Sequence, residues 1–314
     1  MKTTVKSSGR MPVHLLALIM TGAVLLAAAA ACLIAAFAVE GEMSALEKLL
    51  YLLDKRMDRP AIFGTWHLVS VLLTLALTVF LVGRFKDCSD HTLRRVLLVF
   101  WLTLLFFEIY KQLSFAVSFD GFYRATWEYD WHVFPFQFCS TPIYLLPIVI
   151  FAREGRFRNA IVAYMVTFSL FAGFVVMVYP GDVFTSVMSI NIQTMLHHGS
   201  QVAIGMFLVA HNRHHLSKRF FAWSMIVFSF FAAIAFALNV VAHYFMAGVE
   251  FNMFFISPFQ PCTLPVLSVI YPLVPYPVYL IMYILGFTLV SALIYTIEKC
   301  TVSLCSRIKH RDQN

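Results

Sequence analysis

Long apolar runs constrain this chain more than any other feature, because a helix needs roughly 20 apolar residues to cross a membrane. Only 12% of the 314 residues are charged, whereas about 25% are charged in soluble domains. The mean hydropathy is +0.80. We therefore predict an all-α, polytopic membrane protein with eight transmembrane helices and no separate soluble domain. The expected helices cover 13–38, 63–83, 96–118, 131–151, 159–179, 184–210, 220–246 and 276–297.

Basic residues are unequally divided between the two predicted sides of the membrane. Of the 23 lysines and arginines, 17 lie on the side that holds both chain ends, 5 lie on the other side, and Lys111 lies within a span. Positive charge marks the cytoplasmic side, so both termini are expected in the cytoplasm. The net charge of +7 is then a topology signal. We expect a multi-pass protein of the cell membrane and no nucleic-acid partner.

The predicted spans divide the chain into three regions. Residues 1–62 hold an N-terminal anchor helix and a short outer helix, 63–298 form a seven-helix membrane core, and 299–314 form a basic cytoplasmic tail. The first apolar run is longer than a signal peptide's hydrophobic region of about 7–15 residues. Ser44 and Glu47 match a capping box at the start of the outer helix. This helix is either amphipathic and surface-bound or a packed connector.

Polar side chains gather in the outer halves of five predicted spans. At about 1.5 Å per residue, Cys139 lies roughly 12 Å below the outer end of its span, and His197 and His198 lie roughly 20 Å deep. The other candidates are His67, Glu108, Lys111, Asn239 and His243. Because the inner halves are almost purely apolar, we expect one shared cavity that opens outward.

Each of these groups also has a structural interpretation. Glu108 and Lys111 stand at i and i+3, so they can neutralise each other, although charges inside a membrane commonly mark function. Histidines can bond neighbouring helices, and free cysteine often packs as a small hydrophobe. Consecutive helical residues point about 100° apart, so only one of His197 and His198 can face a given groove. The sequence leaves open which one does.

A thiol beside an imidazole is the combination that carries acyl transfer. The imidazole accepts the thiol proton and produces a nucleophilic thiolate, which can attack a lipid ester and hold the acyl group as a thioester. We therefore hypothesise a lipid acyltransferase or acyl hydrolase, with Cys139 as nucleophile and His197 or His198 as base. The partner expected for this enzyme is a membrane lipid or acyl-chain substrate. Ser140 or Thr141 would help to stabilise the oxyanion that forms when the thiolate attacks the ester. A small-ligand or ion transporter or sensor is the alternative, and polar bonding between helices is a third interpretation.

A histidine string offers a competing metal interpretation. His211, His214 and His215 follow an H-x-x-H-H pattern, which places them on one helix face. The string lies on the predicted cytoplasmic side among basic residues, and no second box stands at its depth. A basic interfacial segment is therefore favoured. We expect no metal and no cofactor. The six cysteines show no CxxC pair, so no disulfide framework is expected either.

Five ordered segments carry a resemblance to a known family. They are Trp66-His67-Leu68, Phe134-Pro135-Phe136-Gln137-Phe138-Cys139, His197-His198-Gly199, Asn239 with Phe251-Asn252-Met253-Phe254-Phe255, and Val274-Pro275-Tyr276-Pro277-Val278-Tyr279. Over roughly residues 60–298 the chain resembles the YwaF-type integral membrane proteins of bacteria, which are related to the eukaryotic transmembrane protein 164 acyltransferases.

The resemblance implies a Cys–His acyl-transfer site in a bacterial inner-membrane protein of lipid metabolism. The matching positions are Cys139 with His197 or His198. The resemblance also adds two polar residues to the expected cavity: Gln137, which stands where many bacterial members have a histidine, and Asn252.

Overall fold

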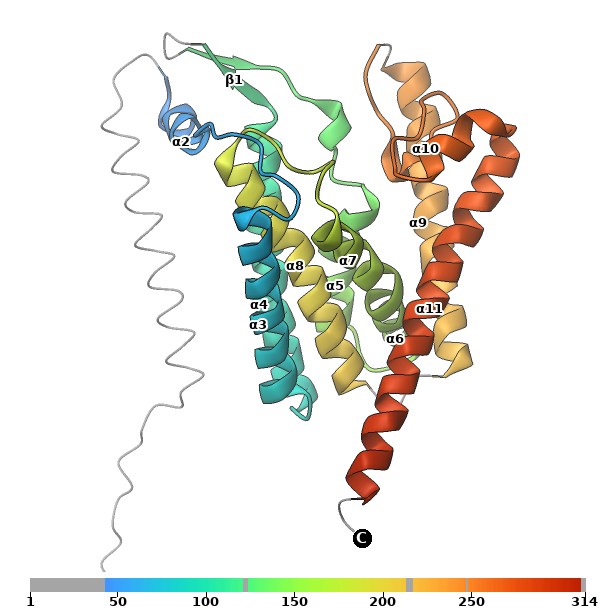
Figure 1. Cartoon of the computed structure of the whole chain (residues 1–314). Coiled ribbons are helices and arrows are strands. Elements are labelled where there is room, and N and C mark those ends of the chain that lie inside the picture. Colours follow the sequence, from blue (N-terminus) through green and yellow to red (C-terminus); the bar gives the residue numbers. More distant parts are fainter. Residues whose placement is uncertain (1–42, 121–123, 213–216, 247, 312–314) are drawn as a thin grey trace, which may run out of the picture. The chain divides into compact units, whose positions relative to one another are not determined.

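The computed structural model describes residues 43–311 except 121–123, 213–216 and 247, so the predicted helix 13–38 lies outside the described residues. Two compact units can be distinguished: one contains the chain up to Lys55 with Val117–Trp127, and the other contains Arg56–Ala116 and the chain from Glu128 onward. The helices are α2 (Ala45–Leu53), α3 (Thr65–Phe85), α4 (Asp90–Ser114), α5 (Thr141–Phe151), α6 (Arg156–Tyr164), α7 (Leu170–Val178), α8 (Met188–His211), α9 (Lys218–Phe245), α10 (Leu267–Ile270) and α11 (Tyr276–Arg311) (Figure 1).

The predicted all-α membrane class is confirmed in outline. Within the described ranges, five helical segments are long and apolar enough to cross a membrane. They are α3, α4, the continuous segment Arg156–Val178, α9 and the Tyr276–Leu304 part of α11. The segment Arg156–Val178 joins α6 to α7 through a π-helical turn, η3 (Met165–Ser169). The only sheet in the described residues is a two-stranded antiparallel hairpin, β1 (Val117–Phe119) with β2 (Ala125–Trp127).

In the first unit, α2 begins at the predicted capping box. The Ser44 backbone N–H donates to Glu47 Oε2 at 2.7 Å, and the Glu47 backbone N–H donates to Ser44 Oγ at 3.4 Å. Two side chains of α2 contact the hairpin. Trp127 Nε1 donates to Glu47 Oε1 at 2.7 Å, and the rings of Tyr51 and Phe119 meet edge to face at 5.4 Å. These are the contacts of a packed connector helix.

The Glu47–Trp127 contact is expected to weaken in acid. The hydrogen bond from Trp127, followed by those from Ser44, lowers the pKa of Glu47 below its ordinary value of 4.5. A carboxyl group with a lowered pKa stabilises the fold at any pH above its ordinary pKa. This contribution is lost as the pH falls through the lowered pKa of the folded protein. Trp127 fluorescence, taken as the difference from a Trp127→Phe protein, should therefore change below about pH 4.5. An unaltered acid response in Glu47→Gln would contradict this.

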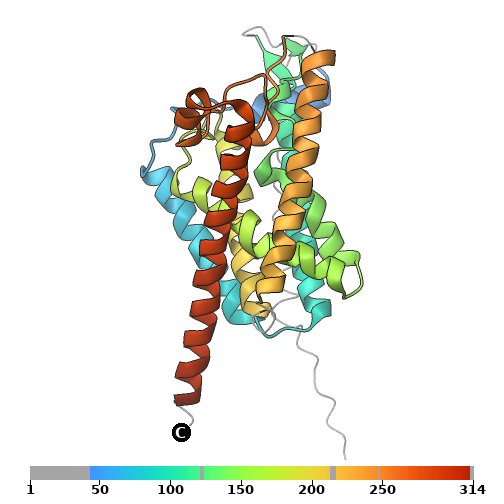
Figure 2. The same cartoon turned by 90° about the vertical axis from the view of Figure 1, so that its right-hand side faces the viewer.

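In the second unit, α8 provides the surface on which the polar residues meet. Its most extensive contacts are with α3 and α7, while α6 packs on α9 and α4 packs on α5 (Figures 1 and 2). Asn191, Gln193 and Gln201 of α8 are buried. A helix buried by neighbouring helices can carry polar side chains that a lipid-facing helix cannot, because those neighbours supply hydrogen-bond partners.

Gly199 allows α3 and α8 to approach closely. A Cβ atom at this position would lie 2.4 Å from Thr74 Oγ1. Gly199→Ala should therefore lower the free energy of unfolding by about 1–3 kcal/mol, as overpacking does. Thr74→Ala in the same chain removes the clashing atoms and should restore most of that stability. Detergent melting curves of the three proteins measure this. A double variant no more stable than Gly199→Ala would show that the clash is not the cause.

Two predicted spans differ in extent from the helices of the structure. The expected helix 131–151 begins only at Thr141, and the chain before it makes two short 3-10 turns, η1 (Trp131–Val133) and η2 (Phe138–Ser140). Pro135 lies between these turns and lacks the N–H that a continuing helix needs. The last predicted span, 276–297, is shorter than α11, which continues through the expected basic tail as far as Arg311; the assignment of that tail to the cytoplasm stays a prediction. No glycine or proline follows Gly286 to end that helix.

Candidate active site around Cys139

The backbone carbonyl of Cys139 is the meeting point of the candidate site. It lies in η2, immediately before α5, and accepts a hydrogen bond from His197 Nε2 at 2.9 Å. Gln201 Nε2 donates to the same oxygen. His197 and Gln201 are four residues apart, so both project from one face of α8. The 3-10 turn that carries the thiol is thus attached to α8 by two side chains.

This contact distinguishes the two adjacent histidines. His197 contacts Cys139, whereas the Nδ1 atom of His198 bonds to the Thr194 carbonyl oxygen of its own helix at 2.7 Å. A nitrogen bonded to a carbonyl oxygen must carry the proton. The remaining nitrogens, His197 Nδ1 and His198 Nε2, are buried without a hydrogen-bond partner in the described part of the chain. Each neutral imidazole therefore keeps one free lone pair, and the ring centroids are 5.3 Å apart.

A buried ion pair lies close to this group. Lys111 Nζ is 2.8 Å from Glu108 Oε1, and Glu108 is buried. The charges of both residues act on the Cys139 thiol and on the His197 imidazole. Because the two charges are opposite in sign and close together, their effects on the sulfur oppose each other, and so do their effects on the ring.

The ion pair is itself held by two side chains that the sequence analysis did not identify. Gln112 Nε2 donates to Glu108 Oε1 at 2.7 Å and to the Val133 carbonyl oxygen at 2.9 Å. The Tyr129 hydroxyl donates to Gln112 Oε1. Gln112 and Gln201 share one signal that could have revealed them: each stands four residues after a candidate residue on the same helix.

Three predicted cavity residues instead bond the backbone of one loop. Gln137 accepts from the Phe254 N–H at 3.0 Å and donates to the Asn252 carbonyl oxygen at 3.1 Å. Asn239 bonds both the N–H and the carbonyl of Met253, at 2.7 and 2.9 Å. The Asn252 side chain bonds Ser257 N–H and the Pro261 carbonyl oxygen, at 2.9 and 3.0 Å. These amides hold the loop in place.

The loop needs this support because its backbone is strained. Phe254 and Phe255 have φ angles of 58° and 57°, in the left-handed region that bulky residues rarely adopt. Such strain persists only where surrounding contacts impose it. Since Gln137 stands two residues before Cys139, the strained loop and the thiol-bearing turn are connected through one side chain.

His67 and His243 make their contacts elsewhere. His67 Nδ1 accepts from the Phe63 N–H at 2.9 Å and Nε2 donates to the Met177 carbonyl oxygen at 2.8 Å, so both nitrogens are used. His243 is exposed and stacks on Phe259 at 3.6 Å, beside a separate pocket of about 500 Å³ that Asn239 also lines. The residues predicted to line one shared cavity thus make their contacts in separate places.

Of the two hydroxyls expected to assist the reaction, that of Thr141 already has partners. Thr141 Oγ1 donates to the Phe138 carbonyl oxygen at 2.9 Å and lies 3.0 Å from the Tyr164 hydroxyl. These bonds connect the end of η2 with α6. A role for either Thr141 or Ser140 in stabilising an oxyanion stays a prediction.

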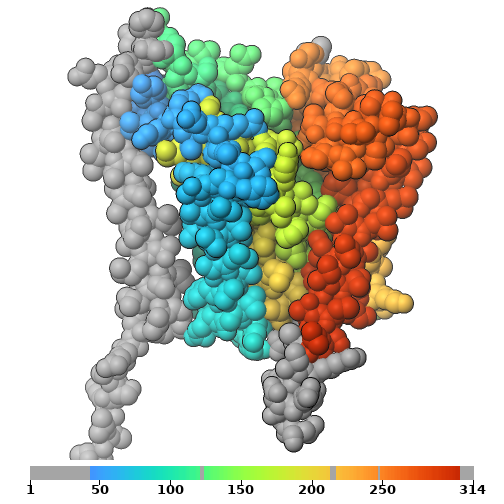
Figure 3. All heavy atoms as spheres, viewed as in Figure 1, coloured from blue at the N-terminus to red at the C-terminus, as the bar shows by residue number. Residues whose placement is uncertain are grey.

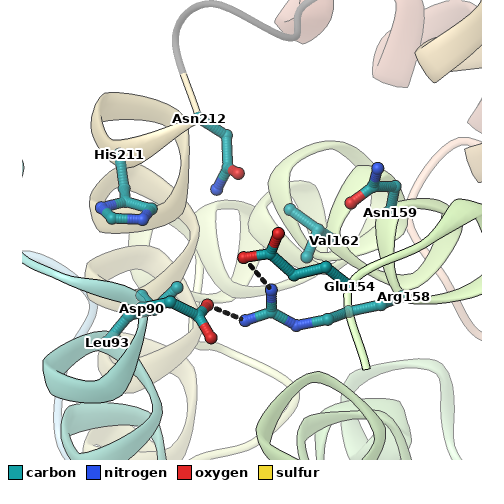
Figure 4. Close-up of a pocket in the computed structure, with 8 residues that line it drawn as sticks. All are labelled: Asp90, Leu93, Glu154, Arg158, Asn159, Val162, His211 and Asn212. Atoms are coloured by element: carbon teal, nitrogen blue, oxygen red, sulfur yellow. Dashed lines mark hydrogen bonds and ion pairs between the residues drawn. The ribbon is translucent and has the colours of Figure 1, made fainter. Parts of the chain in front are cut away.

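The start of the histidine string 211–215 lines a pocket of about 200 Å³ at the other end of α8 (Figure 4). Arg158 is buried there, and its guanidinium lies 2.6 Å from Asp90 and 3.9 Å from Glu154. His211 Nδ1 bonds the Lys86 carbonyl oxygen at 3.2 Å. His214 and His215 lie outside the described residues. Among the residues that can be described, no group of three or more His, Cys, Asp or Glu side chains is placed to hold a metal ion.

The fold and these contacts define the class: an all-α membrane protein with several apolar helices and a buried polar cluster. The family model described as the TMEM164 family matches residues 62–295. The chain belongs to this family, which confirms the resemblance found in its sequence. No curated protein and no solved structure matches the chain.

Proposed function

We propose that this protein is a lipid acyltransferase or acyl hydrolase in which Cys139 is the nucleophile and His197 is the base. The observation that supports this most directly is the 2.9 Å contact of His197 Nε2 with the Cys139 carbonyl oxygen. It brings His197 to the residue that carries the thiol; the free nitrogen, Nδ1, has no hydrogen-bond partner in the described residues, so the reaction requires the thiol to turn toward it. The nearby Glu108–Lys111 pair supplies charges of both signs.

The reaction would proceed in two balanced steps. The free nitrogen of His197 takes the Cys139 proton, and the thiolate attacks the ester carbonyl carbon of a lipid. The ester C–O bond breaks, and the leaving alkoxide takes the proton from the imidazolium, which releases a lysolipid and leaves a thioester. A second lipid hydroxyl, or water, then gives its proton to His197 and attacks the thioester. The C–S bond breaks, the Cys139 thiolate takes the proton back from His197, and the new ester or the free acid leaves.

The same proposal includes a topology of eight membrane spans with both termini in the cytoplasm of a bacterial cell. In this topology, seven helical segments of the described chain are seven of the crossings, and the eighth is the helix expected from the sequence at 13–38, outside the described residues. Two of the seven, α5 and α8, are not among the five long apolar segments. Because α5 has only 11 residues, the irregular chain before it completes that crossing. The polar composition of α8 is explained by its burial among the other helices. The bias of lysine and arginine toward one side supports this orientation.

Trapping the thioester tests the chemistry. Full-length protein in nanodiscs is incubated with phosphatidylcholine that carries an alkyne-tagged acyl chain, and the label is then challenged with hydroxylamine. We expect hydroxylamine-sensitive label on Cys139 and none in Cys139→Ala. Cys262→Ala is the control, because Cys262 is another free cysteine of the described residues; it is buried, whereas Cys139 is half-buried.

The histidines are tested in the same assay. His197→Gln keeps an N–H donor for the Cys139 carbonyl but removes the base, so labelling should slow by about 10²–10⁴-fold. His198→Gln is the neighbouring control and should have a much smaller effect. Unchanged labelling in Cys139→Ala, or equal losses in the two histidine variants, would contradict the proposed roles.

A further inference from the structure

A groove between α3 and α8 is the largest hollow among the described pockets to which no role has yet been given. Its volume is about 690 Å³, within the roughly 300–1,000 Å³ typical of ligand sites. Figure 3 shows the face on which α3 lies beside α8. The lining includes Trp66, Val69, Leu73, Leu77, Ile192 and Gly199. We propose that this groove holds one acyl chain of an outer-leaflet phospholipid, with the chain's ester carbonyl at Trp66.

The dimensions of the groove suit a lipid chain. From Trp66 to Leu77 the helix rises roughly 17 Å, and one leaflet of the hydrocarbon core is about 15 Å thick. Val69 and Leu73 are 48% and 65% exposed, so the groove is open along its side. At membrane depth the medium around such an opening consists of acyl chains.

The polar chemistry of the groove selects an ester. The Trp66 indole nitrogen is buried and has no hydrogen-bond partner among the described residues, whereas a buried indole N–H usually finds an acceptor. Trp66 is the second residue of α3, at the predicted outer end, where tryptophan commonly meets the lipid headgroup region. No charged side chain among the described residues lines the groove. A fatty-acid carboxylate would find no cation there, whereas an ester carbonyl needs only the N–H.

The groove lies beside the candidate catalytic residues. Leu196, Gly199 and Ser200 line it and flank His197 and His198 on α8. Identifying the bound chain as the substrate's chain rests on the proposed function. Occupancy of the groove does not require Cys139 chemistry, so the two ideas can fail separately.

Photocrosslinking tests occupancy in full-length Cys139→Ala protein, which excludes turnover. Nanodiscs of phosphatidylcholine contain an ester-linked phosphatidylcholine with a diazirine in its acyl chain, and crosslinked peptides are mapped by mass spectrometry. We expect crosslinks on residues 65–77 and 192–200. Leu73→Trp should fill the groove and remove most of them. Leu72→Trp is the matched control, since Leu72 and Leu73 are 64% and 65% exposed and Leu72 does not line the groove.

The ester contact is tested with Trp66→Phe. Loss of one hydrogen bond should weaken competition by unlabelled ester lipid about five-fold and leave competition by its ether analogue unchanged. Crosslinks spread evenly over α3, or equal effects of Leu72→Trp and Leu73→Trp, would overturn the site. A Leu73→Trp protein with intact Cys139 that loses crosslinking but still forms thioester at the normal rate would overturn the substrate role alone.

Discussion

Glu108→Leu is expected to lower the free energy of unfolding by about 3–5 kcal/mol, because removing one partner of a buried ion pair leaves the other charge uncompensated. The side chains of Lys111 and Glu108 are only 18% and 6% exposed. The loss should fall toward the lower end of that range, since Lys111 retains some access to its surroundings. Lys111→Met should have a similar effect by stranding Glu108.

The double variant Glu108→Leu/Lys111→Met provides the decisive comparison. Removing both charges together is often nearly neutral, so most of the stability should return. Unfolding in mixed micelles with increasing sodium dodecyl sulfate measures all four proteins, and the cycle isolates the coupling between the two residues. Additive losses in the double variant would show that the pair is not a coupled unit.

The same four proteins separate stability from chemistry. If the pair assists the Cys139–His197 couple, the double variant should regain stability yet form thioester at least about ten-fold more slowly, since charges of both signs are lost. Normal thioester formation in the restabilised double variant would mean that the pair serves the fold alone.

Asn239→Leu is expected to destabilise the protein by about 2–6 kcal/mol. The substitution strands the buried N–H and carbonyl of Met253, which Asn239 bonds at 2.7 and 2.9 Å, and each stranded group costs about 1–3 kcal/mol. It also releases one of the contacts that hold Phe254 and Phe255 at positive φ. Unfolding titrations measure the loss.

Asn239→Asp is the matched control for this prediction. As the neutral acid that burial favours, it keeps an acceptor for the Met253 N–H and an O–H donor for the carbonyl, so at acidic pH its loss of stability should be smaller than that of Asn239→Leu. Limited proteolysis should cleave the loop at 251–257 faster in the leucine variant. Equal stability of the leucine variant and the natural protein would show that the loop does not depend on this side chain.

Much of the architecture could be predicted from local patterns. The apolar runs predicted the positions of most ends of α3, α4 and α9 to within a few residues. The reason is that transfer of side chains into hydrocarbon depends mainly on composition within one segment. The same holds for the start of α2, since a capping box is formed by residues three apart. Local composition also revealed Glu108, Lys111, Cys139 and the paired histidines as unusual.

The roles of the polar residues could not be predicted in this way. Gln137 and Asn239 were expected to share one cavity with Cys139, but both bond the backbone of a loop more than ten residues away in sequence. Gln201 was missed because a glutamine on a helix is unremarkable until a carbonyl from another segment meets it. The irregular chain before α5 was missed because its apolar composition resembles that of a helix.

The sequence alone thus determined that this chain crosses a membrane as helices, to which family it belongs, and which side chains are costly to bury. Only the tertiary structure decided that His197, and not His198, contacts Cys139, and that the thiol lies in a turn attached to α8. The physical reason is range: hydrophobicity and capping act within a few residues, whereas hydrogen-bond partners inside the core come from distant segments whose packing no local pattern records.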